Sequence, residues 1–230
     1  MIKDNIEKIK NKISSVCSSI GRNPADIILI GISKYADSSQ MNEAVAAGLT
    51  HIGENRVQDA KEKFSELMGA AAIVKHMVGH LQTNKVKAAV EIFDIIQSVD
   101  SLKLALEIQK QAERLNKKMV VLVQVNMSRE VQKSGMAPED IDQFLKSVRG
   151  LENIYIQGLM TIGPLTEDRI VVRECFREFK GIFDRIKDQY PADHRLQMKY
   201  LSMGMSGDFE TALEEGANMI RVGRAIFHDS

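Results

Sequence analysis

Eight short apolar runs, spaced along the whole chain, most constrain what this sequence can fold into. Each run is short enough to be a buried strand, and helical patterns fill the intervals between them. The strand candidates lie at residues 27–33, 50–52, 73–78, 94–99, 119–126, 154–160, 199–203 and 218–222. The helix candidates lie at residues 38–47, 55–67, 82–90, 101–116, 138–148, 167–189 and 208–215. Alternation of this kind is typical of βαβ units and a parallel sheet.

Eight such units in 230 residues predict an α/β fold, a single (β/α)8 TIM-type barrel. An extra N-terminal helix precedes it, because apolar residues recur at helical spacing across residues 2–20 and Gly21 follows them. The alternative is a doubly wound open sheet, which more often carries a glycine-rich first turn. The sequence has neither G-x-G-x-x-G nor G-x-x-x-x-G-K-[ST]. With four prolines and no Pro/Gly/Ser-rich linker, we expect one domain over residues 1–230.

The charge balance argues against several classes of partner. The chain has 31 basic and 31 acidic residues, so its net charge is zero. It lacks the excess of basic residues that is typical of proteins that bind nucleic acid or a membrane surface. No stretch approaches the length of a transmembrane helix, and the charged N-terminus lacks the apolar core of a signal peptide. The two cysteines, Cys17 and Cys175, are too few for a disulfide framework. We therefore expect a cytoplasmic protein and, with no apolar surface repeat, a monomer.

The first apolar run ends in an unexpected residue. In "ILIGISK" the run leads through Ser33 directly to Lys34. The active site of a barrel lies at the carboxyl ends of its strands, so Lys34 falls at the expected place. One interpretation is that the strand has ended and the lysine is solvated. The other is that apolar walls lower the pKa of the amine and make it a nucleophile toward an aldehyde.

The seventh and eighth strand exits are rich in small residues. "SMGMSGD" contains Ser202 and Ser206, and "RVGRAIF" contains Gly223 and Arg224. In barrels these two loops, with the start of a short extra helix, frequently hold a phosphate group. The alternative is that the glycines only make tight turns.

Arg221 lies inside the eighth apolar run, where a buried guanidinium needs a partner. One interpretation is a structural ion pair with a carboxylate such as Glu54. The other is a donor to a ring nitrogen, which would stay unprotonated because arginine keeps its own proton. His76 and His80 would not share a helical face, so we expect no metal site.

Motifs along nearly the whole chain resemble the pyridoxal-phosphate (PLP) homeostasis protein family. They are "GISK" (31–34), "HIGENRVQ" (51–58), "HMVGHLQTNKVK" (76–87), "KSGM" (133–136), "GLMTIG" (158–163) and the long segment 200–227. The resemblance implies a barrel similar to that of alanine racemase, without that enzyme's second β-domain. It also implies a Schiff base between PLP and Lys34. Tyr35 and Lys75 depart from the residue types usual beside these motifs.

The resemblance assigns further contacts with the cofactor. Ser202, Gly223 and Arg224 would hold the phosphate, with help from the turn that ends at Ser206. Arg221 would face the pyridine nitrogen. Asn55 would lie beside the cofactor.

Binding PLP does not by itself imply turnover. A racemase needs two bases on opposite faces of the substrate. Lys34 could be one, but none of the four tyrosines is an obvious second. The resemblance implies a non-catalytic role in binding, buffering or delivering PLP, with apo PLP-dependent enzymes as recipients. The alternatives are a small PLP enzyme such as a weak amino-acid racemase, and an aldolase-type enzyme that uses Lys34 without PLP.

Overall fold

The computed structural model describes residues 1–128, 130, 134–191 and 193–228. Eight parallel strands form one closed barrel in sequence order, from β1 to β8. They are β1 (Ile28–Ile32), β2 (His51–Glu54), β3 (Val74–Met77), β4 (Ile95–Val99), β5 (Met119–Gln124), β6 (Ile154–Met160), β7 (Leu196–Ser202) and β8 (Met219–Val222). The predicted barrel is therefore confirmed. An open sheet is excluded because β1 pairs with β8, with Ile30 opposite Arg221.

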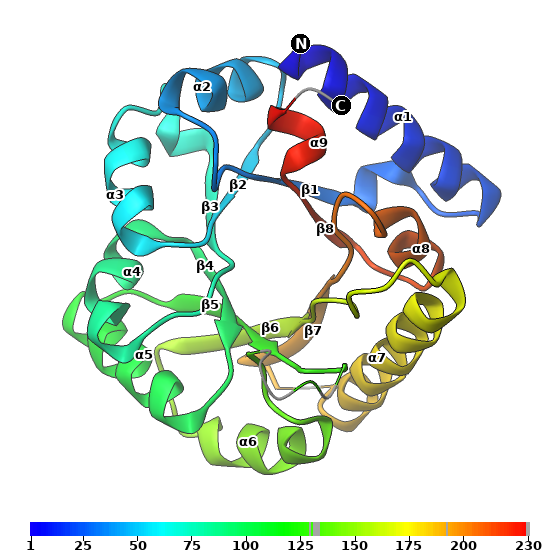
Figure 1. Ribbon diagram of the computed structural model, residues 1–230. Coiled ribbons are helices and arrows are strands. Elements are labelled where there is room, and N and C mark those ends of the chain that lie inside the picture. The colour runs from blue at the N-terminus through cyan, green and yellow to red at the C-terminus, as the bar shows by residue number, and fades with distance from the viewer. Residues whose placement is uncertain (129, 131–133, 192, 229–230) are drawn as a thin grey trace.

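Helices surround the ring of strands on the outside (Figure 1). They are α1 (Ile2–Ser19), α2 (Ser38–Ala46), α3 (Val57–Ser65), α4 (Val86–Ile92), α5 (Leu102–Arg114), α6 (Ile141–Val148), α7 (Arg169–Gln189), α8 (Phe209–Glu214) and α9 (Arg224–Phe227). Short 3-10 turns lie at Pro24–Asp26, Ala70–Ala72, Thr83–Lys85 and Pro138–Asp140. In the described part of the chain, no helix combines the length and apolarity needed to cross a membrane.

The extra N-terminal helix takes the place of a full eighth barrel helix. The element after β8, α9, is a single turn, and α1 packs beside α2, α8 and α9 (Figure 1). Asn5 donates a hydrogen bond to the Ile226 carbonyl at 3.1 Å, and Arg22 donates to the Leu213 carbonyl at 2.9 Å. The apolar stripe of α1 is buried at Ile2, Ile6, Ile9, Ile13 and Cys17. Burial of each isoleucine stabilises the fold by about 2 kcal/mol.

The largest differences from the prediction are in β7 and α9. Strand β7 begins at Leu196, three residues before the predicted start at residue 199. The exposed Lys199 interrupts its apolar pattern, so the first half of the strand was not recognised. Helix α9 was not predicted as a helix, because four residues are too few to reveal a helical period.

The barrel interior holds a small apolar cluster, separate from the large core between the strands and the helices. The buried members of this cluster are Ile30, Ile95, Leu122, Met160 and Met219. Branched apolar residues usually dominate the interior of such a barrel. Here polar residues are buried as well, namely His76, Gln97, Ser202 and Arg221. Of these four residues, Arg221 also lines a cleft at the ends of the strands.

Candidate functional site

A cleft of about 960 Å³ opens at the carboxyl ends of the strands. Residues that follow β1, β2, β3, β6, β7 and β8 line it, as expected for the active-site face of a barrel. Six of the seven predicted site residues are brought together here. They are Lys34, Asn55, Ser206, Arg221, Gly223 and Arg224.

Lys34 lies on the wall of this cleft with its side chain exposed. The strand has therefore ended at Lys34, as the first interpretation expected, and the side chain also lines the cleft; its role as a nucleophile stays a prediction. The Lys34 amine lies 4.5 Å from the centre of the Tyr35 ring. Its hydrogen bond and positive charge lower the pKa of the Tyr35 phenol. Tyr35 is the one tyrosine of the four that lines the cleft.

A buried ion pair anchors the chain just before Lys34. Glu54 is fully buried, and Lys63 on α3 donates to its carboxylate at 2.8 Å. The same lysine donates to the Ser33 carbonyl at 2.8 Å, and the Ser33 hydroxyl donates to Glu54 at 2.8 Å. The proposed pairing of Arg221 with Glu54 is therefore wrong, because Lys63 already compensates that carboxylate.

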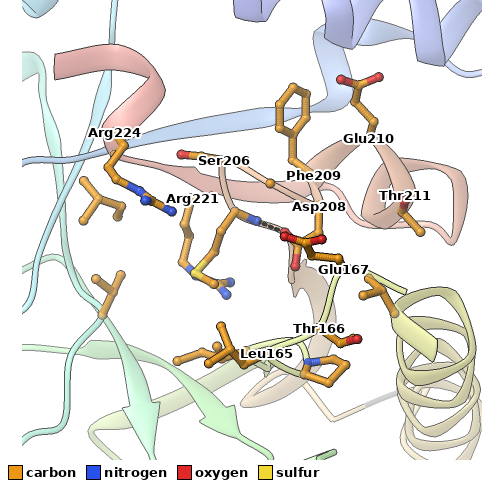
Figure 2. Close-up of a pocket in the computed structure, with 18 of the residues that line it drawn as sticks. Leu165, Thr166, Glu167, Ser206, Asp208, Phe209, Glu210, Thr211, Arg221 and Arg224 are labelled. Carbon is orange, nitrogen blue, oxygen red and sulfur yellow. Dashed lines mark hydrogen bonds between the residues drawn. The ribbon is translucent and has the colours of Figure 1, made fainter. Parts of the chain in front are cut away.

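Arg221 is buried and points its guanidinium toward the cleft (Figure 2). It donates to the Ser202 hydroxyl at 2.6 Å and to the Thr161 carbonyl at 2.7 Å. Burial lowers its pKa to about 10, and the negative charge of Asp208 opposes this shift. The guanidinium therefore remains protonated at neutral pH and acts only as a donor.

Ser202 is the predicted site residue that does not line the cleft. It is fully buried and lies behind Arg221, whose guanidinium donates to it. Its own hydroxyl donates to Gln97 at 2.7 Å. A direct contact of Ser202 with phosphate therefore stays a prediction, and in the structure this hydroxyl serves the arginine.

The loop after β7 folds back against β8 and forms one wall. The Arg221 N–H donates to the Gly204 carbonyl at 3.0 Å, which joins the two segments. Gly204 has φ +94, and a Cβ there would lie 2.9 Å from Cα of Phe209, so the turn requires glycine. Ser206 and Asp208 follow on this loop, and the Met205 N–H donates to the Asp208 carboxylate at 2.5 Å.

Charges of both signs line the cleft, with Arg173 on α7 paired to Glu214. Figure 2 shows Arg221 and Arg224 on one side and Glu167, Asp208 and Glu210 on the other. Burial raises the pKa of the Asp208 carboxyl. An anionic ligand group is therefore favoured on the side of Arg224, at the start of α9.

Two residues behind the cleft were missed by the sequence analysis. Lys63 contacts Glu54 and Gln97 contacts Ser202, yet only Gln97 carried a signal, as a polar residue inside the apolar run 94–99. Two residues of the quoted motifs do not contribute to the described cleft. His80 is exposed, 3.6 Å from the Asp100 carboxylate. Lys133 of the "KSGM" motif lies outside the described residues.

His76, by contrast, is buried within the barrel and is hydrogen-bonded to His51 and Gln97. No cluster of three potential metal ligands occurs among the residues that the structure describes.

Comparisons with known proteins agree with this geometry. The family model for the alanine racemase N-terminal domain matches residues 2–230. A pyridoxal phosphate homeostasis protein of Aquifex aeolicus is 36% identical over 224 residues, 97% of this chain and 96% of its own length. An unknown protein from Bifidobacterium adolescentis has a similar structure, with a TM-score of 0.93 and 33% identity, covering 98% and 94% of the two chains.

The structure of PipY from Synechococcus elongatus with PLP bound is also similar. Its TM-score is 0.84 and its identity 34%, and the match covers 99% of this chain and 100% of PipY. The family model matches almost the whole chain, and the relatives are more than 30% identical over nearly their full length. These two matches establish the family of the chain. The chain belongs to the alanine racemase N-terminal-domain family and, within it, to the pyridoxal phosphate homeostasis proteins.

Proposed function

We propose that this chain binds PLP in the cleft and serves PLP homeostasis by holding, buffering or delivering the cofactor, without dedicated turnover of a substrate. One observation carries the proposal: Lys34 lines the same cleft as Arg221, Gly223 and Arg224. An amine for an aldehyde, a donor for a ring nitrogen and a cationic wall for a phosphate are the groups that PLP requires from a protein. The relative in Aquifex aeolicus is named a pyridoxal phosphate homeostasis protein, and the structure of PipY has been solved with PLP bound.

The residues present fit the cofactor. Lys34 would hold the cofactor through its amine, and bound PLP would supply the aldehyde with which an amine can condense with loss of water. Arg224 and Ser206 would hold the phosphate, together with the backbone N–H groups where α9 begins. A Cβ at Gly223 would lie 3.2 Å from the Ile32 carbonyl, so a larger residue would crowd this wall. Asn55 would lie beside the ring.

The arginine at the ring nitrogen supports a carrier role. Arg221 stays protonated, so it donates to the nitrogen without giving up its proton. An unprotonated pyridine ring is a weak electron sink. The cofactor would therefore be held in a form with little power to stabilise a carbanion.

The placement of the tyrosines supports the same role. Tyr35 lines the cleft but follows Lys34 directly and lies against its amine, so it is poorly placed as a base on the opposite face. The alternative, a weak amino-acid racemase, would need another base, and Asp208 is the ionisable group that faces the cleft near Arg221. Slow exchange that Asp208→Asn abolishes would favour this alternative.

Absorbance of the purified protein after addition of PLP tests the proposal. Wild type should show the band of the bound cofactor, and Lys34→Ala should lose it while keeping weak phosphate-anchored binding. A wild-type protein that takes up no PLP would refute the proposal, and an unchanged spectrum in Lys34→Ala would refute the role of Lys34. Exchange of the α-proton of D- and L-amino acids in deuterated water measures turnover. Sustained multiple turnovers would overturn the carrier role.

The cellular setting belongs to the same proposal. We propose that the protein acts as a cytoplasmic monomer and that apo PLP-dependent enzymes are its recipients. Cys17 is buried as a thiol, which is compatible with a reducing compartment. Size-exclusion chromatography with light scattering would test the monomer, and activation of an apo-enzyme by the loaded protein would test delivery.

A further inference from the structure

A chain of hydrogen-bonded polar side chains crosses the apolar interior of the barrel. It leads from Arg221 on β8 through Ser202 on β7, Gln97 on β4 and His76 on β3 to His51 on β2. The successive distances are 2.6 Å from Arg221 to Ser202, 2.7 Å from Ser202 to Gln97, 2.9 Å from Gln97 to His76 and 2.9 Å from His76 to His51. The three middle residues are fully buried and have no surface exposed to bulk solvent.

The hydrogen bonds of this chain have one direction. Arg221 has only donors, so Ser202 accepts and gives its single hydrogen to Oε1 of Gln97. The amide nitrogen of Gln97 then donates to Nδ1 of His76. His76 must therefore carry its proton on Nε2 and donate it to Nδ1 of His51. In the opposite orientation of the Gln97 amide, both Arg221 and Gln97 would donate to the Ser202 hydroxyl, and its own hydrogen would have no acceptor in this chain.

The surroundings make the middle of this chain sensitive to loss of a partner. The apolar cluster of Ile30, Ile95, Leu122, Met160 and Met219 shares the barrel interior with it. In such surroundings a polar group without a partner is costly, so a network is stable only when every member is satisfied. Burial lowers the pKa of His76 to about 3 and also lowers the pKa of His51. Both imidazoles are thus neutral at pH 7, which leaves Nδ1 of His76 free to accept.

A competing charge lies near the arginine end of the chain. The Asp208 carboxylate attracts Arg221 from the other side of the cleft. The hydrogen bonds to Ser202 and to the Thr161 carbonyl hold the guanidinium on its own side. Loss of the support behind Ser202 would let the guanidinium turn toward Asp208.

Resting on the PLP site proposed above, we propose that Ser202, Gln97 and His76 are positioning residues that hold the Arg221 guanidinium toward the ring nitrogen of the cofactor. None of the three is among the residues that line the cleft. The polar chain thus links the cofactor-facing arginine with the opposite half of the barrel, where His51 begins β2. The position of the Arg221 guanidinium is therefore set by the direction of the hydrogen bonds along this chain and not by the charge of any one residue.

Substitution of Gln97 tests the inference in PLP-loaded protein. Gln97→Leu should weaken PLP binding about tenfold, the effect of losing one good hydrogen bond, and should displace the absorbance maximum of the bound cofactor. Gln97→Glu keeps an acceptor for Ser202 and can share a proton with His76. It should retain the wild-type maximum and an affinity within about threefold.

A matched control separates positioning from mere loss of packing. Gln124 is also a buried glutamine near the end of a strand, but its side chain donates to the Ser134 carbonyl, outside the polar chain. Gln124→Leu should leave the absorbance maximum unchanged. Equal effects of Gln97→Leu and Gln124→Leu on both affinity and spectrum would overturn the inference. If Gln97→Leu does not fold, Gln97→Met, which removes the same acceptor with a more flexible side chain, is measured in its place, with the same expected displacement.

Nitrogen-15 NMR of the imidazoles, in protein without PLP, tests the hydrogen-bond chain independently of cofactor binding. His76 should be the Nε2–H tautomer and should not titrate between pH 5 and 8. A proton on Nδ1, or titration with an ordinary histidine pKa, would overturn the inference even if PLP binds. Failure of wild type to take up PLP would refute the proposed function, while the NMR result would still decide on the chain itself.

Discussion

Replacement of Lys63 by methionine isolates the ion pair beneath Lys34. Methionine keeps most of the apolar stem of the lysine and removes its charge. The Glu54 carboxylate would then keep two donors, the Ser33 hydroxyl at 2.8 Å and the Asn55 N–H at 3.1 Å. It would lose its only ion-pair partner among the described residues, and the Ser33 carbonyl would lose a donor.

The size of the effect follows from burial. Removing one partner of a buried pair costs about 3–5 kcal/mol, because the other charge stays buried and uncompensated. Glu54 is fully buried, but the Lys63 side chain is 18% exposed, so water can partly replace it. We therefore expect Lys63→Met to lower the free energy of unfolding by about 3 kcal/mol, near the lower end of that range.

Urea denaturation measures this difference by linear extrapolation. Lys61→Met is the matched control, since Lys61 lies exposed on the same helix, and its effect should stay within about 0.5 kcal/mol. The double variant Glu54→Gln/Lys63→Met removes both charges and should recover at least about 1 kcal/mol relative to the sum of the two single changes. The reasoning is refuted if Lys63→Met matches Lys61→Met, or if the two single effects simply add.

Two further predictions concern the buried His76 and two glycines, one in a strand and one in a helix. The folded-state pKa of His76, about 3, lies below the ordinary value of 6.5, so its contribution to stability is complete above pH 6.5 and is lost as pH falls toward 3. In urea titrations between pH 6 and 4, wild type should lose about 1.4 kcal/mol more per pH unit than His76→Gln, and equal slopes would contradict the assignment. Gly158→Ala places a Cβ 1.9 Å from the Tyr200 carbonyl at φ +154, so we expect a loss of more than about 3 kcal/mol in the same assay. Gly181→Ala, in the open middle of α7, should instead stabilise by about 1 kcal/mol, and the same sign for both glycines would argue against the packing at Gly158.

The barrel could be predicted from the sequence because its signal is local. Strands such as β1 and β5 are largely buried and read as apolar runs, and the longer helices show their own period. The carboxyl ends of parallel strands meet at one face, so reading the strand exits was enough to place Lys34, Asn55 and Arg224 in one cleft. Helix α9 and the first half of β7 escaped because one is too short for a period and the other is interrupted by Lys199.

The partners of the buried polar groups were decided by tertiary structure alone. Sequence reasoning could recognise that Arg221 needs a partner, but it proposed Glu54, which in the fold belongs to Lys63. Which inward-facing residues meet depends on strand register and on the closure of β8 against β1. The contact between Ser202 and Gln97 joins β7 to β4, two strands that are not neighbours in the barrel. Local patterns therefore determined the shape of the barrel and the face that carries the site, whereas the side-chain pairs that hold the site in place arise only when distant strands are brought into register around a common axis.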